Sequence, residues 1–307
     1  MIRQEAFVNV KKHLKGALHC HTTRSDGRGT PEEVIQLHLQ NGYDFMALTD
    51  HRIYNYQNFG QPITMLGGME MDRNLGGGVH CHHIVCVGPQ DRNRNGFLQD
   101  DRFETVFDSE PSHTQEMLDW IHQKGNLTIY CHPEWSGTPA REFEMLRGNF
   151  AMEVWNSAGA EENELDVNAP YWDELLAQGQ RIFGVATDDG HQMHQHCKGW
   201  VMVNSENNVD AILDALKRGA FYASCGPEIH DFYIKNGNVC VECSPVAEIT
   251  LRHLRWPYTV QRSEDGENRL TRGEFKLGEV RGNNYVRAVV KDAQGRRAWS
   301  NPIFLDD

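Results

Sequence analysis

The segment Leu18-His19-Cys20-His21-Thr22-Thr23-Arg24-Ser25-Asp26-Gly27 joins the end of a short apolar strand to a polar turn. Successive side chains in a strand point to opposite faces, so we expect His19 and His21 to project to the same side. Asp26 adds a carboxylate shortly afterwards. Two imidazoles and a carboxylate are ordinary metal ligands, although an isolated His-X-His pair also occurs by chance. Whether the chain supplies further ligands at strand ends therefore decides the interpretation.

Short apolar runs alternate with helical patterns as far as residue 190. The clearest helix start is Thr30-Pro31-Glu32-Glu33, where Thr30 is the expected N-cap and Glu33 completes a capping box. Helices are expected to begin near residues 31, 112, 139 and 163, and to end near residues 41, 125, 147 and 178. Strands are expected to end at or just before His19, Asp50, Glu70, His132, Asn156 and Asp188, and a further strand begins at His83.

This alternation predicts an α/β fold with a parallel sheet. Seven expected strands before residue 190 favour a (β/α) barrel over an open sheet, and no glycine-rich dinucleotide fingerprint follows the first strand. After the Gly226-Pro227 break the helical periodicity stops, and short alternating runs such as 231–235 and 285–290 predict a small all-β sandwich. The expected domains are therefore residues 1–225, the barrel, and residues 226–307, the sandwich.

Polar side chains of one chemical kind recur at the ends of the expected strands. In a (β/α) barrel, functional residues gather at the carboxyl ends of the strands. Nine nitrogen or oxygen donors exceed the four ligands that one zinc ion takes, so two or three metal ions are expected. The nine are His19, His21, Asp26, His51, Glu70, His83, His132, Asp189 and His191. His83 is unusual because it begins its apolar run, which indicates a strand entering from the site side or a local irregularity.

Charge, hydropathy and cysteine placement restrict which binding partners and which cellular location we expect for this protein. The formal charge of −13 disfavours a nucleic-acid polymer as partner but leaves room for a small anionic substrate held by metal ions. No apolar run approaches the roughly 18 residues needed to cross a membrane, and residues 1–5 lack a signal-peptide pattern. The eight cysteines mostly lie inside apolar runs and predict buried free thiols. We therefore expect a cytoplasmic protein without a membrane partner, of undetermined oligomeric state.

The motifs occur in an order typical of one family. His-X-His-Thr with Ser-Asp-Gly, then Leu-Thr-Asp-His, Gly-X-Glu, His-Ile-Val-X-Val-Gly, His-Pro and Asp-X-His follow one another between residues 17 and 191. This series resembles the PHP (polymerase and histidinol phosphatase) superfamily. The later runs 199–203 and 219–228 are similar to its carbaryl-hydrolase-like branch. The resemblance implies a distorted seven-stranded (β/α) barrel that carries a trinuclear metal site.

The resemblance also implies a division of the ligands among three ions of zinc, manganese or iron. The first ion would be held by His19, His21, Glu70 and Asp189. Glu70 would bridge to a second ion completed by His83 and His132, and Asp26, His51 and His191 would hold the third. His80 and His82 lie beside His83, and Asp188 lies beside Asp189, so these are the alternatives within the motifs. Asp50 is expected to orient a neighbouring ligand, as Glu153 and Asn156 are.

The expected activity is hydrolysis of a small phosphate ester by a metal-bridging hydroxide at this cluster. Hydrolysis of a carboxylic ester, carbamate or amide with the same metals is the alternative. A second alternative is a non-catalytic module that holds metal structurally, which a full ligand set disfavours. Arg24 and His194 are the weaker candidates for contact with substrate, since Arg24 is equally well explained as a solvated turn residue and His194 is better explained as a residue without function.

Overall fold

The computed structural model describes residues 1–75, 80–91, 93–108, 112–165, 167–253, 256–277 and 284–305. Its helices are η1 (Glu5–Phe7), α1 (Pro31–Gln40), α2 (Ser112–Gln123), α3 (Ala140–Phe143), α4 (Ser157–Asn163), α5 (Ala169–Ala177), η2 (Met193–Gln195) and α6 (Val209–Arg218). Its strands are β1 (Ile2–Arg3), β2 (His13–Ala17), β3 (Phe45–Ala47), β4 (Thr64–Leu75), β5 (His80–Gly88), β6 (Val106–Phe107), β7 (Leu127–Tyr130), β8 (Ala151–Asn156), β9 (Phe183–Thr187), β10 (Trp200–Asn204), β11 (Phe221–Ser224), β12 (Ile229–Lys235), β13 (Asn238–Val246), β14 (Glu248–His253), β15 (Trp256–Arg262), β16 (Leu270–Lys276), β17 (Tyr285–Lys291), β18 (Arg297–Ser300) and β19 (Ile303–Phe304).

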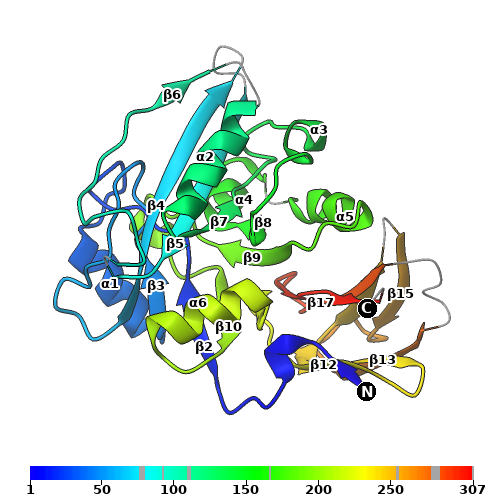
Figure 1. Cartoon of the computed structure of the whole chain (residues 1–307). Helices are drawn as coiled ribbons and strands as arrows, with labels where there is room; N and C mark the ends of the chain where they lie inside the picture. Colours follow the sequence, from blue (N-terminus) through cyan, green and yellow to red (C-terminus); the bar gives the residue numbers. More distant parts are fainter. Residues whose placement is uncertain are drawn as a thin grey trace.

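One large mixed sheet contains most of the strands (Figure 1). Its strands follow the order β15-β14-β17-β18-β11-β10-β2-β3-β4-β5-β7-β8-β9, with β6 and β19 attached at the side. Strands β2, β3 and β4 pair in parallel, as do β7, β8 and β9. Between these two groups β5 runs antiparallel to both neighbours. The fold is therefore mixed α/β, with one reversed strand at its centre.

The expected closed barrel is not present. Strands β2, β3, β4, β5, β7, β8 and β9 lie in that order, but within the described residues β9 does not pair with β2. An isolated parallel bridge, Cys20 with Gly190, joins only the segments that follow these two strands. The other edge of β2 is already occupied by antiparallel β10, which pairs in turn with β11. An edge that is already paired cannot also accept β9, so the sheet continues into the C-terminal strands instead of closing.

Strands β4 and β5 form a long antiparallel pair that changes the position expected for Glu70. The strand does not end at Glu70, because β4 continues as far as Leu75. Glu70 pairs with Val85, and Asp72 pairs with His83. The antiparallel direction of β5 explains why His83 leads its apolar run: this strand enters from the side on which its neighbours end.

The observed helices confirm some of the helix boundaries and buried faces predicted from sequence and correct others. The capping box at Thr30 and Glu33 is present and begins α1, which ends at the C-cap Asn41. In α2 the side chains Met117, Leu118 and Ile121 are buried, as the apolar spacing predicts. The single helix expected over residues 163–178 is wrong in extent. The helix α4 ends at Asn163, where the expected helix begins, and α5 covers only Ala169–Ala177.

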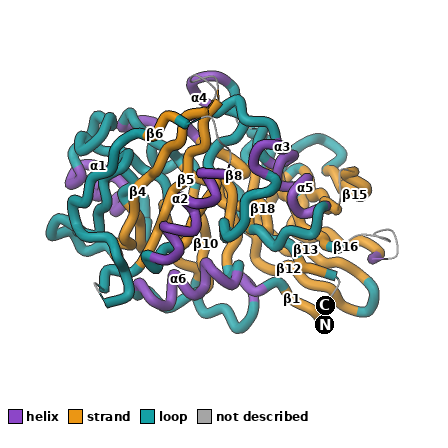
Figure 2. The backbone as a smooth tube through the Cα atoms, turned by 45° about the horizontal axis from the view of Figure 1, so that its top comes forward, coloured by secondary structure: helices purple, strands orange, loops and turns teal. Residues whose placement is uncertain are grey.

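The strands after residue 226 form two packed layers with an apolar core between them. Strands β12, β13 and β16, joined by β1, make a four-stranded sheet, while β14, β17 and β18 belong to the large sheet. Phe232 and Phe275 from one layer pack into one core with Leu251 and Val290 from the other. Two pairings connect this region to the earlier part of the chain, β1 with β12 and β11 with β18. Figure 2 shows these strands beside α5.

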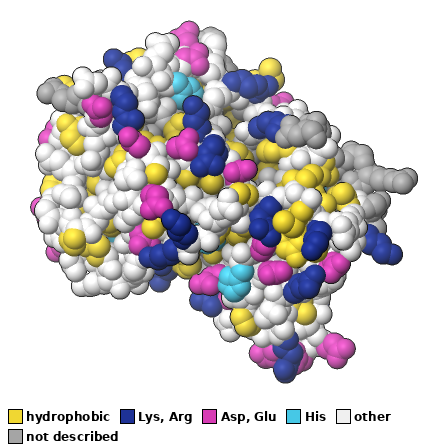
Figure 3. Space-filling model, turned by 60° about the horizontal axis from the view of Figure 1, so that its bottom comes forward, with side chains coloured by type: hydrophobic (Ala, Val, Ile, Leu, Met, Phe, Trp, Pro, Cys, Tyr) yellow, Lys and Arg dark blue, Asp and Glu magenta, His cyan; other side chains and the backbone are white. Residues whose placement is uncertain are grey.

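The surface mixes charges of both signs. On the face in Figure 3, Lys and Arg side chains lie interspersed with Asp and Glu, and small apolar patches lie between them. Among the described residues, none of the helices has the length and apolar character that crossing a membrane requires.

Candidate metal centre

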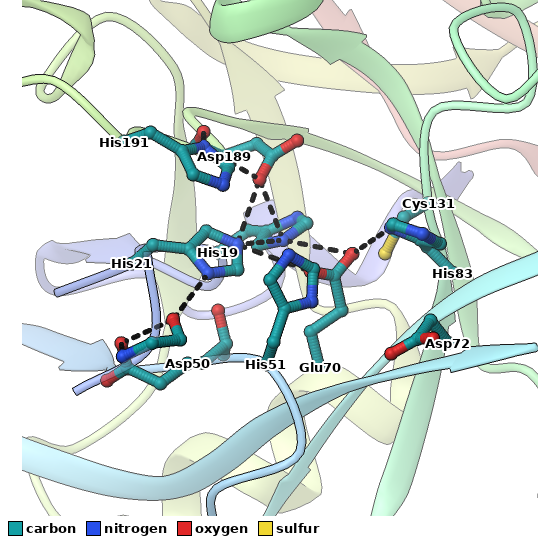
Figure 4. Close-up of polar contacts among 12 residues, drawn as sticks. His19, His21, Asp50, His51, Glu70, Asp72, His83, Cys131, Asp189 and His191 are labelled. Atoms are coloured by element: carbon teal, nitrogen blue, oxygen red, sulfur yellow. Dashed lines mark hydrogen bonds and ion pairs between the residues drawn. The ribbon is translucent and has the colours of Figure 1, made fainter. Parts of the chain in front are cut away.

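Segments far apart in sequence converge at one end of the large sheet (Figure 4). His19 and His21 follow β2, His51 follows β3, and Asp26 lies in the turn between β2 and α1. Glu70 and His83 project from within β4 and β5. His132 follows β7, and Asp189 and His191 follow β9. The structure thus brings all nine sequence-predicted donors into one cluster.

Four of these side chains form an inner group, namely His19, His21, Glu70 and Asp189. The Nε2 atoms of His19 and His21 lie 3.2 Å apart. Asp189 Oδ1 lies 3.1 Å from His19 Nε2 and 3.0 Å from His21 Nε2. Glu70 Oε1 lies 3.4 Å from His19 Nε2, and its Oε2 lies 3.2 Å from His21 Nε2. Ligands at about 2.0–2.1 Å from a tetrahedral zinc ion are about 3.3 Å apart, so this group has the dimensions of a metal site.

The carboxylate of Glu70 faces five imidazole rings. Besides the contacts to His19 and His21, its Oε1 lies 2.9 Å from His83 Nδ1 and 3.5 Å from His132 Nε2. Its Oε2 lies 3.1 Å from His51 Nδ1. Each carboxylate oxygen therefore has its own set of nitrogen neighbours, so Glu70 would offer one oxygen to a metal ion on either side.

An outer group surrounds Asp26 at the solvent side. Asp26 Oδ2 lies 3.6 Å from His51 Nε2 and 3.5 Å from His191 Nε2, and its Oδ1 lies 3.6 Å from His21 Nδ1. The Asp26 side chain is 53% exposed, whereas the side chains of His21 and Glu70 are fully buried. His51 and His21 each face both groups, so the division of ligands among ions is less sharp than the motif order implies.

Several buried polar atoms of the cluster have no hydrogen-bond partner. They include Glu70 Oε2, Asp189 Oδ1 and His51 Nδ1. Burying an ionised carboxylate is costly unless a counter-charge or hydrogen bond compensates it. A divalent cation bound among these atoms would satisfy the carboxylate oxygens and the imidazole lone pairs together. The donor set therefore fits divalent metal ions.

The backbone at two of the ligands is strained. His132 has a φ of 23° and Asp189 a φ of 51°, in the left-handed region that non-glycine residues rarely adopt. Each such residue costs roughly 1–3 kcal/mol and persists only where surrounding structure imposes it. Both strained residues direct their side chains at the inner group, His132 through Nε2 at 3.5 Å from Asp189 Oδ2. Strain at these positions is typical of a functional site.

Glu153, at the middle of β8, forms hydrogen bonds with residues of the cluster on the side away from Glu70. Its Oε1 accepts a 2.6 Å hydrogen bond from His19 Nδ1–H, so the lone pair of His19 Nε2 points at the cluster. Glu153 also accepts hydrogen bonds from the His132 backbone N–H at 3.0 Å, and from Thr187 and Asn156. Asn156 further donates to Asp189 Oδ2 at 3.3 Å. This network fixes the ring orientation of His19 and the tautomer it presents.

Asp50 shapes the turn that carries Asp26. Its Oδ1 accepts the backbone N–H of Thr22 at 2.7 Å and the Ser25 hydroxyl at 2.9 Å. The Thr22 hydroxyl donates to Oδ2 at 2.8 Å. The carboxylate is thereby used within the turn, and Asp50 acts on its neighbours rather than in the cluster.

The alternative histidines lie elsewhere. His82 is buried on the opposite face of β5, with Nδ1 2.7 Å from the Tyr130 hydroxyl, and His80 Nδ1 donates to the Gly137 carbonyl at 2.7 Å. His194 lies on η2, where its side chain is 65% exposed and its Nε2 is 2.7 Å from Glu161. His194 thus pairs with Glu161, and its assignment to substrate contact stays a prediction.

A polar cavity of about 430 Å³ opens beside the outer group. Asp26 and His51 line it together with Arg24 and Arg102. Arg24 forms an ion pair with Asp100, whereas no ion pair is found for Arg102 among the described residues. Arg102 belongs to a polar stretch over residues 89–110 that is rich in Asp, Arg and Asn. This stretch was recognisable from its composition, but nothing in that composition distinguished Arg102 from its neighbours.

No protein-family model matches the chain, and no curated protein matches its sequence. Among solved structures, a two-domain protein from Bacteroides vulgatus that contains a predicted PHP-like metal-dependent phosphoesterase is similar over 96% of both chains. Its TM-score is 0.51 at 14% identity. An amidohydrolase from Chromobacterium violaceum matches 58% of this chain and 87% of its own, with a TM-score of 0.41 at 17% identity.

This chain shares the fold of the PHP-like protein. The likeness extends through the C-terminal strands, because it covers nearly the whole of each chain.

Metal binding at the inner group is expected to become stronger as the pH rises towards 9. Burial opposes a proton on His21, but the carboxylates of Asp189 and Glu70 outweigh it and raise the pKa of His21 to about 9. A metal ion must displace this proton. In the metal-free protein the protonated ring stabilises the fold below pH 6.5, and this contribution is lost as the pH rises to about 9.

The measurement is the melting temperature of chelator-treated and metal-loaded protein between pH 6.5 and 9. The difference between the two should grow with pH across this range, and calorimetric titration with metal should show proton release. A difference that shrinks with pH would contradict the assignment of His21.

Proposed function

We propose that this protein is a metal-dependent hydrolase of the PHP superfamily that cleaves a small phosphate ester. The observation that carries the proposal is the carboxylate of Glu70, set between five imidazole rings. One of these rings, His51, also lines the cavity that contains Arg24 and Arg102. Divalent ions held there supply Lewis acidity and a nucleophilic water at neutral pH. The similarity of residues 199–203 and 219–228 to the carbaryl-hydrolase-like branch supports placing the protein in that branch.

We infer two or three ions from the donors. The inner group offers four ligands, the nitrogens of His83 and His132 extend it across Glu70 Oε1, and Asp26 with His51 and His191 forms the outer set. Mixed imidazole and carboxylate ligands suit zinc, manganese or iron alike. Metal analysis of the purified protein distinguishes these ions and counts them.

The charge of the cavity favours a phosphate group in the substrate. Arg102 and Arg24 lie on the wall that contains Asp26 and His51, so an anion bound between them and the outer group would contact both arginines and ions. A phosphate monoester carries its negative charge on three terminal oxygens. Several cations in one site can bind these oxygens together. A carboxylic ester, carbamate or amide would use the same cluster but would bring no anionic group to Arg102, whereas Arg24 already pairs with Asp100.

The test is a substrate panel of phosphate monoesters, phosphate diesters, carboxylic esters and carbamates, assayed with Mn²⁺ or Zn²⁺. We expect turnover of a phosphate monoester. Arg102→Gln should raise KM for that substrate by about tenfold to a hundredfold, since a charge-assisted hydrogen bond contributes about 1.5–3 kcal/mol. Its metal content should stay unchanged.

Arg94→Gln is the matched control, because Arg94 is exposed and pairs with Asp210 away from the cavity. Its KM should equal that of the wild type. Turnover of carboxylic esters or carbamates without any phosphate release would replace the lead proposal by the alternative. Full metal loading without turnover of any class would favour the non-catalytic module.

A further inference from the structure

A second cluster of buried donors lies behind the metal centre and takes no part in it. Cys20 sits between His19 and His21 in sequence and points to the opposite face. Its Sγ, a ring nitrogen of His38 on α1 and a ring nitrogen of His196 after η2 all lie within 4.8 Å of one another. All three residues are buried. Three segments of the chain thus meet at one thiol and two imidazoles.

The ring of His38 is fixed in the orientation that a metal ligand needs. Its Nδ1–H donates to the Val34 carbonyl at 2.8 Å, one turn earlier in α1, so Nε2 is the nitrogen that faces Cys20. Burial opposes a proton on this ring, but Cys20 and Asp188 raise the pKa of His38, so a metal ion would have to displace the Nε2 proton. Nε2 is 3.6 Å from Cys20 Sγ. A tetrahedral zinc ion with Zn–S of about 2.3 Å and Zn–N of about 2.05 Å separates sulfur from nitrogen by about 3.6 Å. The observed separation therefore has the length that a shared ion would impose.

His196 provides the independent sign of a missing ligand. The residue is 3% exposed, yet neither ring nitrogen has a hydrogen-bond partner. Buried imidazole nitrogens are nearly always paired with protein or water, and leaving one unpaired costs about 1–3 kcal/mol. The ring packs closely against Gly190, where a Cβ would lie only 2.5 Å from His196 Nδ1. A hydrogen bond between Cys20 and His38 alone would leave His196 unexplained.

The surroundings suit a cation. His38 Nε2 lies 3.9 Å from Asp188 Oδ2. Asp188 is buried and is held in place by the backbone N–H groups of Cys197, Lys198 and Gly199, at 2.6, 2.9 and 2.8 Å. Burial, together with the neighbouring His38, lowers the pKa of His196 to about 3, so this ring is neutral and has a lone pair at physiological pH.

We propose that Cys20, His38 and His196 bind one structural zinc-type ion, separate from the ions of the metal centre. Binding releases the thiol proton, because the thiolate is the ligand. The soft sulfur selects zinc over manganese or magnesium, whereas the nitrogen and oxygen donors of the metal centre do not. The ion would tie α1 and the segment after η2 to the backbone between His19 and His21. It would thereby brace the first metal-centre motif from behind.

Cobalt(II) distinguishes this site from the metal centre because only a thiolate ligand gives a sulfur-to-cobalt charge-transfer band in the near ultraviolet. Chelator-treated protein reconstituted with Co²⁺ should show this band. Cys20→Ser should abolish it and should bind one ion fewer per chain. Cys131→Ser is the matched control, since Cys131 is a buried thiol beside His19 but outside the proposed site, and it should retain the band.

Absence of the band in the wild-type protein would overturn the proposal without any variant. Persistence of the band in Cys20→Ser would do the same. Should Cys20→Ser fail to fold, His196→Gln should still shift the band, and an unchanged spectrum would count against the site. Asp26→Asn impairs only the outer group and should keep the band, so the result does not depend on the proposed hydrolase activity.

Discussion

Asp189→Asn is expected to lose metal and to lower kcat/KM by roughly 10³-fold or more, whereas Asp188→Asn retains both metal and most of the activity. The two carboxylates are adjacent in sequence but face different partners. Asp189 Oδ1 lies 3.1 Å and 3.0 Å from the Nε2 atoms of His19 and His21. An amide at this position removes a negative charge and presents at best one weak oxygen ligand.

Asp188→Asn should act on stability instead. Its two oxygens accept three backbone N–H groups, so an amide nitrogen in place of one oxygen meets donors rather than acceptors. We expect a loss of about 1–3 kcal/mol in the free energy of unfolding. Metal analysis and denaturant unfolding of the two variants check this pair of results. Equal metal content in the wild type and Asp189→Asn would show that the ligand has been misassigned.

Glu70→Gln and Glu153→Gln should differ in whether excess metal rescues them. Glu70 contributes an oxygen to each side of the cluster, so Gln in its place should empty the centre and abolish activity at any metal concentration. Glu153 contacts His19 Nδ1 and acts through that ring. Loss of such an orienting carboxylate typically weakens metal affinity by about 10–100-fold.

The measurement is activity as a function of free Mn²⁺ or Zn²⁺ concentration. For Glu153→Gln the curve should shift to higher metal concentration and still approach the wild-type maximum. For Glu70→Gln it should remain flat. A Glu153→Gln curve that coincides with the wild type would remove Glu153 as a positioning residue, and rescue of Glu70→Gln by metal would show that Glu70 is not a bridging ligand.

Local signals predicted the elements whose formation depends on neighbouring residues. The capping box at Thr30 and Glu33 needs only four residues in a row, and it begins α1 as expected. The single helix expected over residues 163–178 was wrong, because the apolar pattern does not show that the left-handed cap at Glu164 ends α4 and that α5 begins only at Ala169. The length of an apolar pattern therefore predicts the length of a helix poorly where a left-handed residue ends the helix within the pattern.

The closure of the sheet was not accessible to the same reasoning. Periodicity shows that a segment is a strand, but not which strand takes each of its edges. The pairing of β10 with β2 replaces the expected closure, and it depends on a segment more than 180 residues further along the chain. Likewise Glu70 was expected at a strand end, whereas the β4–β5 pairing extends the strand past it.

The sequence by itself determined the chemical character of the site. A cluster of nine imidazole and carboxylate donors was expected because such residues recur where apolar runs end, and the resemblance to the PHP superfamily implied the grouping of His19, His21, Glu70 and Asp189. Tertiary structure alone decided which atoms meet. It set Glu70 among five rings, turned Cys20 towards His38 and His196, and assigned Asp188 to backbone N–H groups while Asp189 faces the cluster. Such choices depend on distances between segments remote in sequence, and only the packed sheet fixes those distances.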